Sequence, residues 1–410
     1  MELFHILSGV VSLSAILAFV NQRYIKLPAA IALMLAGLII SLLVQGIGAL
    51  SPAFQAAVVQ SLETINFSEI VLDFMLSFLL FAGALHTDYT KLKESRKPII
   101  TFATFGVIFS TFLVGTGVYG ILYLLGQPLD YVYCLLFGAL ITPTDPVAVM
   151  GILKKAGVPK KVETTIVGES LFNDGVGVVV FLLLLEIARI GFDQLSAAEI
   201  GSLILKEIGG GLALGLFLGW AGYRIMKRID DYPTEVMITL AIVMGGYSAA
   251  YYLHFSGPLA MVAAGLLIGN TGHKGAMSDI TADYVHKFWE MMDEILNAIL
   301  FVLIGLELLL VPFEWNYLLI GFIAIVIVLG SRYLALALPS RLFGFLKDYP
   351  KGTLNVMTWG GLRGGISIAL ALSLSTEMGR EFWVPITYTV VIFSLLVQGL
   401  TVERLARNLK

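Results

Sequence analysis

Long apolar stretches follow one another along the whole chain, separated by short polar or Gly/Pro-containing segments. Most stretches hold about 20 residues, the length that an α-helix needs to cross the hydrocarbon core of a membrane. The first stretch lacks a basic N-terminal region and a small-residue cleavage site, which favours a span over a signal peptide. The pattern predicts thirteen spans, at residues 3–20, 27–48, 65–86, 98–125, 130–152, 163–188, 200–223, 235–253, 258–270, 288–311, 316–338, 352–375 and 382–402.

Composition supports the same fold class. Hydrophobic residues make up 58% of the chain and charged residues only 13%, against about 25% charged residues in soluble domains. The mean hydropathy is +0.89. With 26 basic against 29 acidic residues, the chain has no basic excess with which to bind nucleic acid. We therefore expect an all-α polytopic membrane protein over residues 1–410, without a soluble domain or a nucleic-acid partner.

Basic residues predict the orientation of these spans. Loops after odd-numbered spans carry nearly all of them, whereas loops after even-numbered spans carry only Arg189 and Arg380. Lys and Arg concentrate in cytoplasmic loops. We therefore expect the N-terminus outside and the C-terminus in the cytoplasm.

The fifth predicted span carries polar residues between two prolines, in Thr142-Pro-Thr-Asp-Pro146. Because proline has no amide hydrogen, carbonyl groups one turn earlier lose their helical partners. At membrane depth this is tolerated only where the backbone lines a cavity or is buried in protein. Carbonyls, the Thr144 hydroxyl and the Asp145 carboxylate are hard oxygen ligands suited to a small cation. A structural proline kink is the alternative interpretation.

The sixth predicted span carries a polar face in Gly168-Glu-Ser-Leu-Phe-Asn-Asp-Gly175. Glu169 and Asn173 are i, i+4 neighbours, as are Ser170 and Asp174. Asp174 lies near the predicted midplane, where a carboxylate is costly to ionise and a bound cation offsets that cost. Such a group can hold either a proton or a metal ion, which exchange requires. An internally paired structural carboxylate is the alternative, and it fits Glu169 better than Asp174.

Two arginines also lie at membrane depth, Arg332 in span eleven and Arg363 in span twelve. Each needs a buried acidic partner, because arginine keeps its proton. Arg363 is surrounded by glycines in Gly360-Gly-Leu-Arg-Gly-Gly365, which weaken a helix. Broken spans five and twelve are seven spans apart and cross in opposite directions. This offset indicates inverted repeats of six spans each, 1–6 and 8–13.

At these residues the chain resembles the NhaP/NHE-type sodium/proton antiporters, the first monovalent cation:proton antiporter family. The resemblance covers nearly the whole chain. It rests on Thr144-Asp145-Pro146, on Gly168 through Gly175, on Gly360 through Gly364 and on Asn297 through Glu307. It implies an NhaA/NhaP-like fold in a homodimer. The core domain would hold spans 4–6 and 11–13, and the dimerisation domain spans 1–3 and 7–10.

The resemblance also implies roles for single residues. Asp174 would carry the cation and the proton in turn, and Thr144, Asp145 and Ser170 would complete a Na⁺ site. Asn173, in place of a second aspartate, implies electroneutral one-for-one exchange. Glu169 would pair with Arg332, and Arg363 would have a structural or gating role.

One position departs from the pattern of many relatives, which have an acidic residue in span three. Here Ala82 occupies that position. Asp73, on the same predicted helix, is a possible replacement as a cation ligand.

We therefore expect a secondary antiporter that exchanges Na⁺ or Li⁺ for H⁺ by alternating access and serves pH homeostasis. No ATPase motif is present in the sequence, and we expect neither an enzyme nor a cofactor. A prokaryotic plasma membrane is the expected location. A K⁺/H⁺ antiporter of the same architecture is the nearest alternative, and a passive cation channel is the alternative from another class.

Overall fold

The computed structural model describes residues 2–63, 66–127, 129–191, 197–271, 277–311 and 314–409, and these residues contain helices and no strand. The first ten α-helices are α1 (Glu2–Val20), α2 (Ala29–Gly48), α3 (Pro52–Glu63), α4 (Phe67–Glu69), α5 (Leu76–Leu85), α6 (Tyr89–Glu94), α7 (Arg96–Leu124), α8 (Tyr131–Ile141), α9 (Pro146–Ala156) and α10 (Lys160–Ile190). The others are α11 (Ala197–Ile204), α12 (Gly210–Met226), α13 (Tyr232–Leu253), α14 (Gly257–Thr271), α15 (Asp279–Glu307), α16 (Trp315–Phe343), α17 (Thr353–Trp359), α18 (Gly365–Leu372), α19 (Arg380–Phe393) and α20 (Gly399–Ala406).

Several of these helices are joined or flanked by short segments of other helical types. Wider π-helical turns continue some α-helices, and the described residues also include two single turns of 3₁₀-helix. The π-helical turns are Asn21–Ile25, Ile70–Met75, Leu205–Gly209 and Ser394–Gln398, and the 3₁₀ turns are Leu308–Leu310 and Thr376–Met378.

The all-α membrane architecture predicted from the sequence is confirmed. Nine helical stretches in the described part of the chain are long and apolar enough to cross a membrane. The other four predicted spans coincide with the interrupted pairs α8/α9 and α17/α18, with the short helix α14, and with α15, which carries acidic residues. The count of thirteen membrane crossings stays a prediction.

The sequence pattern missed two features of the helices. Helix α15 begins at Asp279, nine residues before the predicted span, because Ser278 caps it by accepting a hydrogen bond from the Thr281 amide. Helix α3 was not predicted as an element. Lys274, one of the basic residues behind the predicted orientation, lies outside the described residues.

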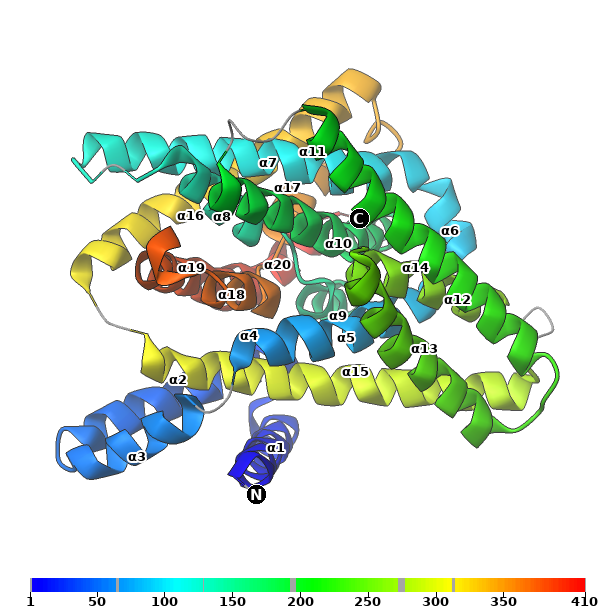
Figure 1. The fold of residues 1–410 in the computed structure, drawn as a ribbon, viewed down its shortest axis with the longest axis horizontal. Coiled ribbons are helices and arrows are strands. Elements are labelled where there is room, and N and C mark those ends of the chain that lie inside the picture. The colour runs from blue at the N-terminus through cyan, green and yellow to red at the C-terminus, as the bar shows by residue number, and fades with distance from the viewer. Residues whose placement is uncertain are drawn as a thin grey trace.

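Helix α10 lies at the centre of the helix assembly. It packs against α7, α8, α9 and α14, and Figure 1 shows it near the middle of the view with α7 and α15 along opposite sides. In its most apolar window 67% of the residues are buried, against 11% for the stretch of α11 and α12. The polar face of α10 is therefore enclosed by protein.

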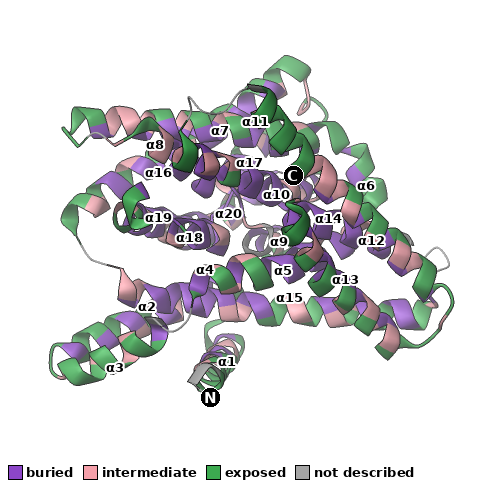
Figure 2. Ribbon diagram, viewed as in Figure 1, coloured by how far each residue is buried: buried purple, intermediate pink, exposed green. Residues whose placement is uncertain are grey.

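The outer surface of the assembly is apolar. Figure 2 shows buried residues concentrated in the middle and exposed ones on the peripheral helices. Among the exposed side chains are Phe217 on α12, Tyr252 on α13 and Phe322 on α16. A large apolar surface of this kind is typical of contact with lipid.

Candidate ion-binding site

The first break in the helices falls where the two prolines were noted. Helix α8 ends at Ile141 and α9 begins at Pro146, so residues 142–145 are not helical. Pro143 has no amide hydrogen with which to continue the helical hydrogen bonds, so α8 ends here although Thr142 itself keeps helical backbone angles (φ −77°, ψ −35°). The Thr142 hydroxyl instead donates to the Gly138 carbonyl at 2.6 Å. The proline chemistry therefore ends α8 inside the protein.

The second break lies between α17 and α18, over residues 360–364. Two of its glycines allow side chains of other helices to lie against the backbone of the break. A Cβ atom on Gly361 would lie 2.9 Å from Nε of Arg332, and one on Gly364 would lie 2.6 Å from Oδ2 of Asp145. Both positions therefore require glycine, because the Cβ atom of any other residue would displace the side chain of Arg332 or Asp145.

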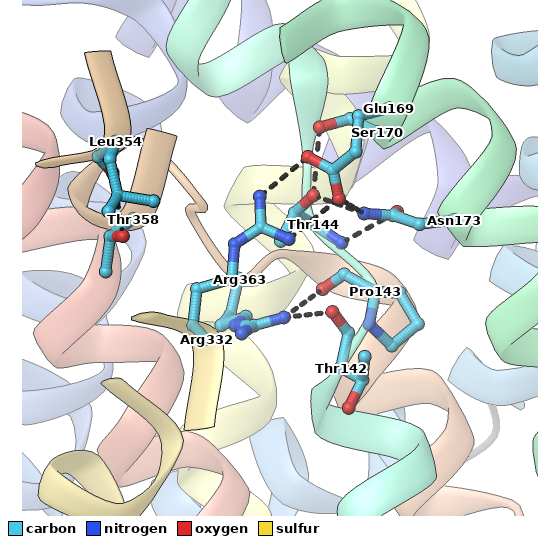
Figure 3. Close-up of polar contacts among 10 residues, drawn as sticks. All are labelled: Thr142, Pro143, Thr144, Glu169, Ser170, Asn173, Arg332, Leu354, Thr358 and Arg363. Atoms are coloured by element: carbon cyan, nitrogen blue, oxygen red, sulfur yellow. Dashed lines mark hydrogen bonds and ion pairs between the residues drawn. The ribbon is translucent and has the colours of Figure 1, made fainter. Parts of the chain in front are cut away.

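The two breaks contact each other directly. The Asp145 amide donates to the Leu362 carbonyl at 2.8 Å. The Arg363 guanidinium donates to the carbonyls of Thr142 and Pro143, the latter at 3.1 Å (Figure 3). Carbonyls at a helix C-terminus carry partial negative charge and lack helical partners. Arg363 therefore neutralises the inner end of α8 through two backbone carbonyls.

Glu169 and Arg332 form a bidentate ion pair. Nη1 and Nη2 of Arg332 lie 2.7 and 2.6 Å from the two carboxylate oxygens of Glu169. Glu169 is completely buried and Arg332 is 6% exposed. Both oxygens of Glu169 are thereby occupied, which makes this carboxylate a poor candidate for exchanging ions.

Asn173 connects this ion pair to the first break. Its side-chain amide nitrogen lies 2.7 Å from Oε1 of Glu169 and 2.7 Å from the Thr144 hydroxyl. Its amide oxygen accepts from the Thr144 backbone amide at 3.2 Å. The Thr144 hydroxyl also lies 2.9 Å from the Ser170 hydroxyl (Figure 3). This network holds Thr144 against α10.

Asp174 lies one residue beyond this network and has a different environment. It is 3% exposed. Its buried Oδ1 atom has no hydrogen-bond partner among the described residues. A buried acceptor without a partner lowers the stability of the fold, and binding a cation or a proton would remove this cost.

A cavity of about 950 Å³ reaches Asp174 and is also lined by Thr144 and Asp145. It extends to the helix ends that carry Lys91 and Lys154, so ions have an aqueous route to the carboxylates from one side. Asp88, at the same end, accepts a hydrogen bond from the Lys91 side chain, which lowers the pKa of Asp88 below its ordinary value. Asp88 therefore stays ionised at the entrance, where it forms an ion pair with Lys91.

Sequence reasoning missed the acidic residues of α15 that line this cavity. Glu290, Asp293 and Glu294 line it, as does Asn297, and the sequence pattern assigned none of these four residues a role in ion binding. Asn297 donates to the Asp293 backbone carbonyl at 2.8 Å and to its carboxylate at 3.0 Å. Their spacing of three or four residues along one helical face was the available signal.

Asp73 does not lie with these residues. Its side chain is exposed on the π-helical turn before α5, and it does not line the cavity. In the described part of the chain, no group of three or more His, Cys, Asp or Glu residues is arranged to hold a metal. A cation at Asp174 would therefore need other oxygen ligands as well as carboxylates, and the Thr144 side chain lines the same cavity.

Two interrupted helices that contact each other beside buried carboxylates are typical of secondary transporters with discontinuous helices. The chain matches the family described as sodium/hydrogen exchanger, transmembrane, over residues 10–408, and it belongs to that family. It is 47% identical to the Na⁺/H⁺ antiporter NhaP of Pseudomonas aeruginosa, over 98% of this chain and 96% of that protein. It is 34% identical to the Na⁺/H⁺ antiporter NhaH of Halobacillus dabanensis, over 94% and 93% of the two chains.

The fold is also similar to a solved structure. The sodium proton antiporter MjNhaP1 of Methanocaldococcus jannaschii superposes with a TM-score of 0.76 at 21% identity, covering 100% of this chain and 99% of the other. The NhaP-like fold expected from the sequence is therefore confirmed.

Proposed function

We propose that this protein exchanges Na⁺ for H⁺ across the membrane, with Asp174 binding the cation and the proton in turn. The observation that carries the proposal is the buried, unpartnered Oδ1 of Asp174 at the end of a cavity. The full-length similarity to proteins named Na⁺/H⁺ antiporters supports Na⁺ as the cation. Asp145, Thr144 and Ser170 would complete the site, with Li⁺ as a further substrate.

Exchange would be electroneutral, one Na⁺ for one H⁺. Asn173 supports this stoichiometry, because the residue before Asp174 is a neutral amide engaged with Glu169 and Thr144. A single carboxylate that binds either a cation or a proton carries one charge in each direction.

Transport would follow alternating access. Helices α7, α8, α10, α16 and α19 pack on one another, whereas α5, α12, α13 and α14 form a second packed group and α15 packs on α2 and α5. This division supports a core domain that moves against a dimerisation domain in a homodimer. The basic loops support a cytoplasmic cavity entrance and an N-terminus outside. Similarity to bacterial antiporters supports a prokaryotic plasma membrane as the location, where exchange would serve pH homeostasis.

The test is dissipation of a pH gradient in proteoliposomes by Na⁺, Li⁺ and K⁺ in turn. Na⁺ or Li⁺ should dissipate the gradient with the purified protein and not in empty vesicles. A response to K⁺ alone would favour the K⁺/H⁺ alternative. Electrical recording distinguishes an antiporter from a passive cation channel, because electroneutral exchange produces no current whereas a channel does.

A further inference from the structure

A second cavity, of about 650 Å³, lies where α6, the start of α7, the start of α10 and the loop after α16 meet. It shares no lining residue with the ion cavity. The proposed transport mechanism gives this cavity no role.

The charges around this cavity do not balance. Four basic residues line it, Lys93, Arg96, Lys97 and Lys161, against two acidic residues, Glu94 and Asp348. Among the described residues, none of the four basic side chains forms an ion pair with a carboxylate. Unpaired cations gathered in a concave surface attract an anion.

One wall of the cavity is held in place from several helices. Tyr349 is buried, and its hydroxyl lies 2.9 Å from the hydroxyl of Thr165 on α10 and donates to that of Ser95 at 3.4 Å. Nζ of Lys161 lies over the Tyr349 ring, 4.5 Å from its centroid. The basic side chains therefore lie beside an aromatic side chain that is held in place by hydrogen bonds to two other helical segments.

Exposed apolar side chains lead away from this cavity along two packed helices. Helices α7 and α16 contact each other, and both carry a series of exposed apolar residues that ends at the basic cluster. These are Ile100, Phe105, Ile108 and Phe112 on α7, and Leu334, Leu338, Leu342 and Phe343 on α16. The cavity thus lies at one end of a protein surface suited to contact with lipid acyl chains. Lipid headgroups are expected at that end.

We propose that this cavity binds the headgroup of an anionic phospholipid, with its acyl chains along α7 and α16. The phosphate would accept hydrogen bonds from Lys93, Arg96, Lys97 and Lys161. The bound lipid would bridge α7, α10 and α16, the last two of which carry Glu169 and Arg332. Binding therefore stabilises the helices that hold the ion site.

The experiment compares lipids on the purified full-length chain. Native mass spectrometry measures retained lipid, and thermal unfolding measures stabilisation by phosphatidylglycerol, by phosphatidylcholine and by soluble glycerol 3-phosphate. The test variant is Lys93→Gln/Arg96→Gln/Lys97→Gln. The matched control, Arg224→Gln/Lys227→Gln/Arg228→Gln, removes as many charges from a loop on the same predicted side of the membrane.

We expect wild type and control to retain phosphatidylglycerol and to melt at higher temperature with it. Each charge contributes about five-fold, so the test variant should bind on the order of 100-fold more weakly. Equal retention by test variant and control would overturn the proposal. Stabilisation by glycerol 3-phosphate equal to that by phosphatidylglycerol would show a site for soluble phosphates. Retention of phosphatidylcholine equal to that of phosphatidylglycerol would show that the cavity does not select the headgroup. Either result would contradict the proposal.

A single variant keeps the proposal testable if the triple variant does not fold. Lys97→Glu should then lower phosphatidylglycerol retention, whereas Arg228→Glu should leave it unchanged. The same loss in both would overturn the assignment of the site to this cavity.

Discussion

The Asp145 amide donates to the Leu362 carbonyl at 2.8 Å, which joins the two broken helices at one point. The next residue after Leu362, Arg363, contacts the carbonyls of Thr142 and Pro143 on the other side of the crossing. The carboxylate of Asp145 lies against Gly364. A displacement of either break is therefore transmitted to the other, and the candidate ion ligands lie beside this crossing.

Replacing Gly364 tests whether this close approach matters for transport. A Cβ atom there would lie 2.6 Å from Oδ2 of Asp145, so Gly364→Ala must push the carboxylate away. Overpacking costs about 1–3 kcal/mol, and the same increase in the barrier to exchange lowers the rate about five- to 150-fold. The measurement is Na⁺-driven dissipation of a pH gradient in proteoliposomes.

Gly120→Ala is the matched control, because nothing lies within 4 Å of a Cβ atom at that position of α7. The control should exchange at the wild-type rate. A Gly364→Ala protein as active as this control would show that the position of the Asp145 carboxylate is unimportant.

Glu169→Gln tests the structural role of the buried ion pair. The change keeps the shape of the side chain and leaves the Arg332 charge buried without its counter-charge. Breaking such a pair costs about 3–5 kcal/mol. We expect a clearly lower melting temperature, with partial recovery in Glu169→Gln/Arg332→Met, where both charges are gone. A single variant as stable as wild type would argue against this role.

The sequence was sufficient to predict the helix breaks, because Pro143, Pro146 and the glycines around Arg363 act on the local backbone. The spacing of the polar residues in span six was also sufficient to predict that they lie on one face of a helix. The α15 acids were missed because the face that a helix turns toward a cavity depends on its packing partners. The carbonyl acceptors of Arg363 were missed for a similar reason, since only the contact between the two breaks brings these carbonyls to the arginine.

Asp293→Asn tests whether the acids of α15 concentrate cations in the cavity. Loss of one negative charge near the route should raise the KM for Na⁺ about two- to five-fold and change the maximal rate little. Asp283→Asn is the control, because Asp283 lies on the same helix, pairs with Lys287 and does not line the cavity. An equal effect of the two variants on KM would rule out a local role for Asp293.

Competition between Na⁺ and H⁺ at Asp174 predicts the direction of the pH dependence. Lowering the pH protonates the free carboxylate, so more Na⁺ is needed to occupy it. The apparent KM for Na⁺ should rise as pH falls, by up to about tenfold per pH unit where the protonated form dominates. Exchange rates over a grid of Na⁺ concentration and pH measure this. A KM that stays constant while the rate changes with pH would indicate separate sites.

Asp174 is tested most directly as the shared site for Na⁺ and H⁺ by the exchange rate of Asp174→Asn in proteoliposomes. An amide cannot alternate between a cation-bound anion and a protonated acid. We expect that Na⁺ no longer dissipates the pH gradient, while elution in size-exclusion chromatography and the circular-dichroism spectrum match those of the wild type. A wild-type exchange rate in this variant would show that Asp174 does not bind the exchanged ions.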